Sequence, residues 1–204
     1  MYFFRKNCDE SKHPLDKVAK FRYIKRMRKT SIDEVQHNFS SQKSGFAFAK
    51  IYNSSLLIKL YYPEKETLLL QKWIEDSHQE ILLTSLHEIE MTNAMSLKLY
   101  RDEITHDEHA IWIKTFQADK RLGILKAVSL DWPTTFYTAI KLAKKATPQT
   151  GARSLDVLHV AAALELSCKG FLTHDKRQAS LAEQAGLKVI SIHPPDIRSP
   201  VKPA

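Results

Sequence analysis

Short apolar runs alternate along this chain with longer stretches whose apolar side chains recur at helical spacing, from Gly45 onward. Continuous apolar runs of four to eight residues are typical of buried strands, and recurrence at i, i+3 and i+4 is typical of amphipathic helices. The apolar runs predict strands over residues 46–52, 81–83, 124–130, 170–173 and 187–192. Because strands that alternate with helices form parallel sheets covered on both faces, the predicted fold class is α/β: a helix-rich, three-layer α/β/α domain with about five parallel strands.

Capping residues indicate where several of the expected helices begin. Ser85 with Glu88, and Thr105 with Glu108, have the spacing of a capping box, and Ser154 is expected to cap an Ala-rich helix. The sequence Thr-Pro-Gln-Thr-Gly at 147–151 predicts a loop. The helix after the first strand is expected to end at Pro63, and the others to cover about 64–78, 85–100, 105–122, 131–146, 155–168 and 177–186.

The chain length predicts one folded domain with a segment at each end. The 204 residues suffice for one well-buried domain and are few for two. We assign the domain to residues 46–192, a basic extension to 1–45 and a Pro-rich tail to 193–204. Residues 1–45 hold 11 Lys/Arg against 5 Asp/Glu, so they carry most of the net charge of +8. Such a segment can attract phosphate backbones, or it can be a solvated tail that is disordered or partly helical.

Cysteine content and hydropathy indicate a cytoplasmic protein. The two cysteines, Cys8 and Cys168, provide no disulfide framework and no metal-binding spacing. The residues after Met1 lack the apolar core of an export signal, and no run approaches the ~18 apolar residues of a membrane span. We therefore expect neither export nor membrane insertion.

Oxygen-bearing side chains lie at junctions that follow the predicted strands. Glu90, Asp156 and Asp175 are the acidic ones, and Asn53 occupies the same kind of junction after the first strand. The carboxyl ends of parallel strands meet at one edge of a sheet, where ligands of such folds bind. Carboxylates that gather without basic partners repel one another unless a cation joins them, and hard oxygen ligands suit Mg²⁺ or Mn²⁺. The sequence therefore predicts a divalent-metal site, and such a site can place a water molecule for attack on a phosphodiester.

Each acid also has a purely structural interpretation. Asp175 has the position of a helix N-cap, Asp156 can interact with a helix dipole from the first turn, and Glu90 can be a solvated helix residue. For any one of these residues alone, the structural interpretation is favoured. Three acids at junctions of the same kind, taken together, favour a functional site. The His106-Asp-Glu-His109 cluster, by contrast, is interpreted as the charged first turn of a capped helix.

The short stretches of sequence around these side chains resemble those of PIN-domain ribonucleases, in particular the VapC-like toxins of toxin–antitoxin pairs. The matching stretches lie within 46–192, and the most specific is Leu155-Asp-Val-Leu-His-Val-Ala-Ala-Ala-Leu164. The resemblance implies a Mg²⁺- or Mn²⁺-dependent endoribonuclease that cleaves single-stranded RNA, with a protein antitoxin as partner and a homodimeric state. It also implies that Glu90, Asp156 and Asp175 are the catalytic, metal-binding acids.

Four further residues are assigned roles around this predicted site. Ser55 and Thr173 are expected to orient the ligands through hydroxyl hydrogen bonds, with plain helix capping as the alternative. Lys176 and Arg177 are candidates for contacts with RNA phosphates, and surface placement is the alternative.

Asn53 departs from the family pattern, which has an aspartate at this position. An amide oxygen can bind a hard cation, but it brings no charge, so the nominal charge of the predicted site falls from −4 to −3. We therefore expect an impaired enzyme. The alternative is a non-catalytic PIN-fold protein that binds RNA or an antitoxin without cleaving RNA.

Overall fold

A five-stranded parallel sheet forms the centre of the part of the chain that the structure describes. The computed structural model describes residues 50–192 apart from 63, 65, 78 and 79. The strand order is β3-β2-β1-β4-β5. The strands are β1 Lys50–Tyr52, β2 Ile81–Leu83, β3 Leu125–Ala127, β4 Gly170–Leu172 and β5 Lys188–Ile190. The predicted α/β class and the parallel sheet are confirmed, although each strand has only 3 residues.

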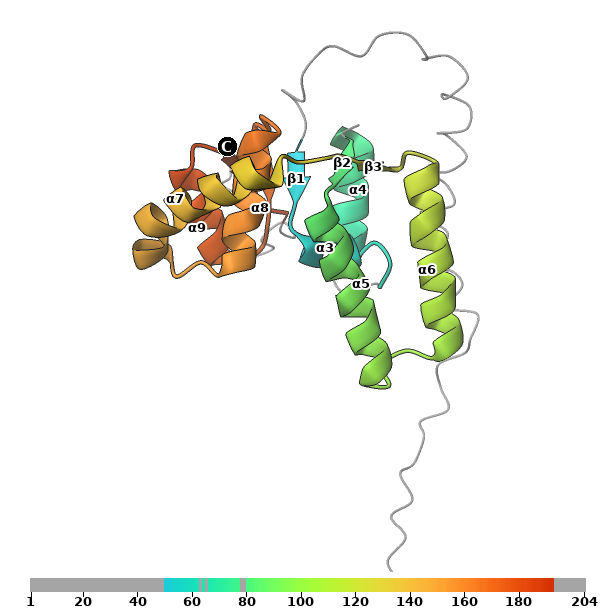
Figure 1. Ribbon diagram of the computed structural model, residues 1–204. Coiled ribbons are helices and arrows are strands. Elements are labelled where there is room, and N and C mark those ends of the chain that lie inside the picture. Colours follow the sequence, from blue (N-terminus) through green and yellow to red (C-terminus); the bar gives the residue numbers. More distant parts are fainter. Residues whose placement is uncertain (1–49, 63, 65, 78–79, 193–204) are drawn as a thin grey trace, which may run out of the picture.

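The helices occupy the predicted intervals between the strands. They are α3 Ser54–Ile58, α4 Thr67–Ser77, α5 Ser85–Tyr100, α6 His106–Arg121, α7 Trp132–Thr150, α8 Ser154–Glu165 and α9 Lys176–Gln184. In Figure 1, the last three labelled helices, α7 to α9, lie on one side of β1, and α4 to α6 lie on the other. The predicted extension 1–45, the tail 193–204 and the beginning of the first predicted strand lie outside the described residues.

Two predicted helix caps were wrong by one residue. The capping box of α5 is formed by Thr84 with His87, and not by Ser85 with Glu88. The N-cap of α8 is Arg153 rather than Ser154. In α5 the His87 ring accepts from the Thr84 N–H, and in α8 the Asp156 carboxylate accepts from the Arg153 N–H, so each cap lies one residue before the predicted one. The box of Thr105 with Glu108 is confirmed.

The predicted loop at 147–151 was also wrong, because α7 continues to Thr150 with Pro148 inside its last turn. A proline in a helix removes one backbone donor and disturbs the preceding turn. Here the Thr150 hydroxyl donates to the Ala146 carbonyl at 3.0 Å, and Ala152, just past the end of the helix, is buried in the core. Gly151 then ends the helix in the left-handed conformation, with φ of 64°, and its N–H donates to the Thr147 carbonyl. Glycine adopts this conformation without the penalty of a Cβ atom.

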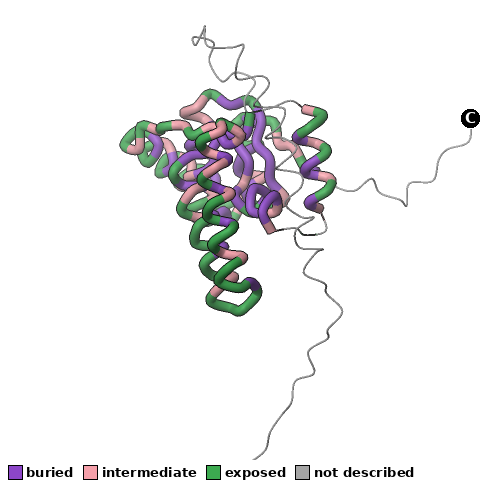
Figure 2. Tube along the Cα trace, turned by 90° about the vertical axis from the view of Figure 1, so that its right-hand side faces the viewer, coloured by how far each residue is buried: buried purple, intermediate pink, exposed green. Residues whose placement is uncertain are grey.

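Side chains from the two faces of the sheet belong to two separate core clusters. Tyr52, Leu83 and Leu172 pack in a cluster with residues of α3 to α6. Their strand neighbours Ile51, Leu82 and Phe171 pack with residues of α7 to α9. This alternation follows from the two-residue period of a strand. The central strands β1, β2 and β4 therefore lie buried between helices, and Figure 2 shows the buried residues gathered in the middle of the fold.

The strand order reverses between β1 and β4. The chain runs from β1 to β2 and β3 on one side, and β4 and β5 are added on the other side of β1. The carboxyl ends of β1 and β4 lie side by side, and the N–H of Asn53 donates to the Leu172 carbonyl at 2.8 Å. Ligands of open parallel sheets bind at such a reversal. The predicted site residues after β1 and β4 therefore lie at the position where this fold places ligands.

Candidate functional site

Asn53 begins α3 at the carboxyl end of β1. Its side-chain Oδ1 accepts from the Ser55 N–H at 2.7 Å, which is an ordinary N-cap bond. Its Nδ2 donates to Oε1 of Gln178 at 2.5 Å. Gln178 is a fully buried residue of α9, the helix that follows β4. The amide pair thus connects the two strands that flank the reversal of strand order.

Glu90 lies one turn into α5, with its carboxylate between two neighbouring elements. The Ser54 hydroxyl donates to Glu90 Oε2 at 2.7 Å. His159 of α8 forms an ion pair with the same carboxylate oxygen through Nε2. The Glu90 side chain is 25% exposed, whereas that of His159 is 2% exposed. Side-chain contacts thereby join α3, which follows β1, to α5 and α8.

The ionised form of Glu90 is favoured by these partners. Burial raises the pKa of Glu90, but the hydrogen bond and positive charge of His159, with the Ser54 hydroxyl, outweigh burial and hold this pKa below its usual value. His159 Nε2 therefore acts as a donor to a carboxylate. A negatively charged oxygen is thus maintained at the edge of the sheet.

His87 lies behind this ion pair and is held as a neutral imidazole. Its Nε2 donates to the Tyr52 carbonyl at 2.7 Å, and its Nδ1 accepts from the Thr84 N–H at 3.2 Å. An imidazolium has no acceptor, so these two bonds require the neutral ring. Burial lowers the pKa of His87 to about 3, and the nearby His159 acts in the same direction. The ring centroids of His87 and His159 are 4.6 Å apart.

Asp156 and Asp175 lie at the starts of two helices, where their carboxylates accept from backbone N–H groups. The prediction that Asp156 follows a strand was wrong, because α8 comes directly after α7. Asp156 Oδ2 accepts from the Arg153 N–H at 3.0 Å. Asp175 is the N-cap of α9, and its Oδ1 accepts from the N–H groups of Arg177 at 2.8 Å and Gln178 at 3.2 Å. Asp175 is exposed and Asp156 is half-buried. Both carboxylates therefore make the backbone contacts expected of acids whose role at a helix start is purely structural.

The residues predicted to support the site have different positions. The Thr173 hydroxyl oxygen accepts from the backbone N–H of Asp175 at 3.0 Å, so this bond does not involve the Asp175 carboxylate. Ser55 is exposed, and the hydroxyl that contacts Glu90 belongs to its neighbour Ser54. Lys176 and Arg177 are exposed in the first turn of α9, next to Asp175.

The predicted metal ligands do not form a closely spaced donor group. Within residues 50–192, as far as the structure describes them, no three His, Cys, Asp or Glu side chains are close enough to hold a metal ion. Asn53 is paired with Gln178 and Glu90 with His159, so two of the four predicted ligands already have protein partners. The residues present therefore do not fit a Mg²⁺ or Mn²⁺ ion as they are arranged.

Sequence reasoning missed Ser54 and Gln178. Ser54 is adjacent to the cap residue Asn53. The local sequence around Ser54 or Gln178 does not indicate whether the side chain is buried in a polar contact or exposed. His159 was part of the specific segment, but its pairing with Glu90 depends on the packing of α5 near α8. The missed contacts therefore all join residues that are far apart in sequence.

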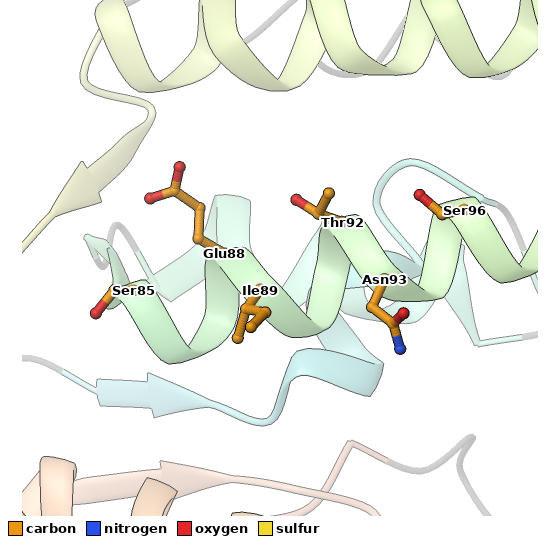
Figure 3. Close-up of a pocket in the computed structure, with 6 residues that line it drawn as sticks. All are labelled: Ser85, Glu88, Ile89, Thr92, Asn93 and Ser96. Carbon is orange, nitrogen blue, oxygen red and sulfur yellow. The ribbon is translucent and has the colours of Figure 1, made fainter.

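A shallow pocket lies along another part of α5. Its lining residues all come from that helix (Figure 3): Ser85, Glu88, Ile89, Thr92, Asn93 and Ser96. Glu88 forms an ion pair with Lys120 of α6. Because Glu90 is not among the lining residues, this pocket is separate from the contacts at the reversal of strand order.

Comparison of this chain with protein-family models and with curated proteins finds no match. None of the helices in the described part of the chain combines the length and the apolar character that a membrane crossing needs.

Proposed function

We propose that this chain is a PIN-like, VapC-type protein with an impaired endoribonuclease site at the carboxyl edge of its sheet. The observation that carries the proposal is the group of side-chain contacts at the reversal of strand order: Ser54 and His159 bind Glu90, and the neighbouring Asn53 pairs with Gln178. These contacts join stretches that are separated in sequence, and the family resemblance also brings these stretches together. The three-layer PIN arrangement of residues 46–192 and a cytoplasmic location are parts of the same proposal.

The charges at this edge support a weakened site rather than a complete one. Glu90 is held ionised, but Asn53 supplies a neutral amide where the resemblance implies a carboxylate. Asp156 and Asp175 are engaged in helix capping. Because these donors do not fit a metal ion as they lie, we derive no cleavage step through Mg²⁺ or Mn²⁺. The exposed side chains of Lys176 and Arg177 are the proposed contacts for RNA phosphates.

The test is cleavage of single-stranded RNA by the wild-type chain and by Asn53→Asp, each with Mn²⁺ and with EDTA. We expect slow or absent cleavage by the wild type and a Mn²⁺-dependent increase in the variant, because the added carboxylate strengthens attraction for a cation. Asp156→Asn in the Asn53→Asp background is expected to remove the gain. This change keeps an acceptor for the Arg153 N–H, so it tests charge and not helix capping.

Asp107→Asn is the matched control, since Asp107 is an exposed acid in the first turn of α6. It should leave the gain unchanged. If Asn53→Asp cleaves no RNA in Mn²⁺ at any concentration tested, the ribonuclease proposal fails. Equal cleavage by the wild type and the variant would show that the amide suffices and that the site is not impaired.

A second candidate is a non-catalytic protein that binds RNA or an antitoxin. It is favoured by the pairing of Asn53 with Gln178 and of Glu90 with His159, because these polar groups have partners within the protein. Fluorescence anisotropy with labelled RNA in EDTA distinguishes the candidates, since this second function requires binding without cleavage. The proposed homodimer is tested separately by sedimentation.

A further inference from the structure

The backbone decides which way the Asn53 amide points. Its Oδ1 accepts from the Ser55 N–H, and only an oxygen can fill this role. The Nδ2 group must therefore face Gln178, where it donates to Oε1. An aspartate at position 53 would keep the cap bond but would bring a second oxygen toward Gln178. With Gln178 oriented as it is, the contact to Oε1 requires a donor, which the asparagine amide supplies and a carboxylate does not.

Gln178 is in turn held by its own helix. Its N–H donates to Asp175 Oδ1 at 3.2 Å, and its side chain is fully buried. With Oε1 facing Asn53, its Nε2 has no hydrogen-bond partner among the residues that the structure describes. Leaving a buried donor unpaired is costly, so the Asn53 contact must outweigh this cost for the observed orientation to persist. Gln178 therefore depends on Asn53 for the arrangement it adopts.

We infer that the Asn53–Gln178 amide pair makes this edge of the sheet stable without a divalent cation, with Gln178 as the positioning residue that fixes the uncharged form. The pair joins the residue that follows β1 to the first turn of α9, the helix that follows β4, by a neutral hydrogen bond. A carboxylate in this pair would place a negative charge beside a buried side chain, and a cation could offset that charge. The inference rests on the site of the proposed function but does not require RNA cleavage.

Gln178→Glu tests the inference with almost no change in shape. The carboxylate that this change introduces can still accept from Asn53 Nδ2, and an anionic oxygen replaces the unpaired Nε2. We expect the melting temperature of the wild type to be the same in EDTA and in Mn²⁺. That of Gln178→Glu should be lower in EDTA and should rise in saturating Mn²⁺ by at least about 4 °C, since a ligand that binds only the folded state raises stability.

Gln184→Glu is the matched control, because Gln184 is an exposed residue of the same helix. It should melt at the same temperature with and without Mn²⁺. Asn53→Asp is a second variant for the case in which Gln178→Glu does not fold, and it should show the same dependence on Mn²⁺. Gln178→Leu, which removes the pair, should melt below the wild type in both buffers.

A rise of the wild-type melting temperature in Mn²⁺ to match the charged variants would overturn the inference. So would charged variants that do not respond to Mn²⁺, or a Gln178→Leu protein as stable as the wild type. These outcomes are independent of cleavage. If Mn²⁺ leaves the melting temperature of the wild type unchanged and raises that of the charged variants, the amide-pair inference is supported. This holds even if no variant cleaves RNA, and in that case only the ribonuclease proposal fails.

Discussion

The carboxylate of Glu90 and the carboxylates of Asp156 and Asp175 lie in the same part of the fold but have different partners. Glu90 is bound by the side chains of Ser54 and His159, which come from two other helices. Asp156 and Asp175 accept from backbone N–H groups within three residues of themselves. The first arrangement depends on tertiary packing, and the second would form in an isolated helix start.

This difference shows how burial decides the partners of a polar group. Around Glu90 the hydroxyl of Ser54 and the rings of His87 and His159 are buried, so each needs a partner from within the protein. Asp175 is exposed and can exchange its capping bonds for water. We therefore expect changes in the buried group to affect stability more than changes at the exposed caps.

The largest expected effect comes from acid acting on His87. Its folded-state pKa of about 3 lies below its unfolded value of 6.5, so the stabilisation is complete above pH 6.5 and is lost as the pH falls toward 3. The lowered pKa of Glu90 acts in the same direction below its usual range. In His87→Gln the amide can still donate to the Tyr52 carbonyl but does not titrate.

Urea denaturation between pH 7 and pH 4.5 measures this effect. Below pH 6.5 the unfolding free energy of the wild type should fall faster than that of His87→Gln, by about 1.4 kcal/mol per pH unit for one proton. Parallel curves for the two proteins would show that His87 is not the group responsible.

Ser54→Ala is expected to have the next largest effect. The change removes the hydroxyl that donates to Glu90, and a hydrogen bond to a carboxylate contributes about 1.5 kcal/mol when it is partly shielded from water. Ser55→Ala is the matched control one residue along α3, and it should be close to neutral because Ser55 is exposed. Equal losses in the two variants, measured by urea denaturation, would contradict the special role of Ser54.

Asp175→Ala should cost less, about 1 kcal/mol, because it removes an exposed N-cap of α9. Asp175→Asn should be nearly neutral, since asparagine caps a helix as well as aspartate does. Thermal melts of both variants provide the measurement. A large loss for Asp175→Asn would mean that the charge of Asp175, and not its capping role, stabilises the fold.

Much of the fold was predictable because it depends on local patterns. The apolar runs gave the parallel strands, and the Thr105 box and the Asp175 cap have local sequence signals. The end of α7 was not predictable in the same way, because the turn around Pro148 depends on the Thr150 hydroxyl bond to the Ala146 carbonyl and on burial of Ala152. For the candidate site, the sequence placed Asn53 and Glu90 at the correct junctions but did not identify Gln178.

The sequence by itself determined which residue types lie at the ends of the strands, since hydrophobic period and capping preference act over a few neighbouring residues. Only the tertiary structure decided how their side chains are paired. Asn53 and Gln178 are 125 positions apart, and Glu90 and His159 are 69 apart. Such contacts depend on the strand order and on the packing of helices against the sheet. Burial then makes each polar group take the nearest partner that this packing provides.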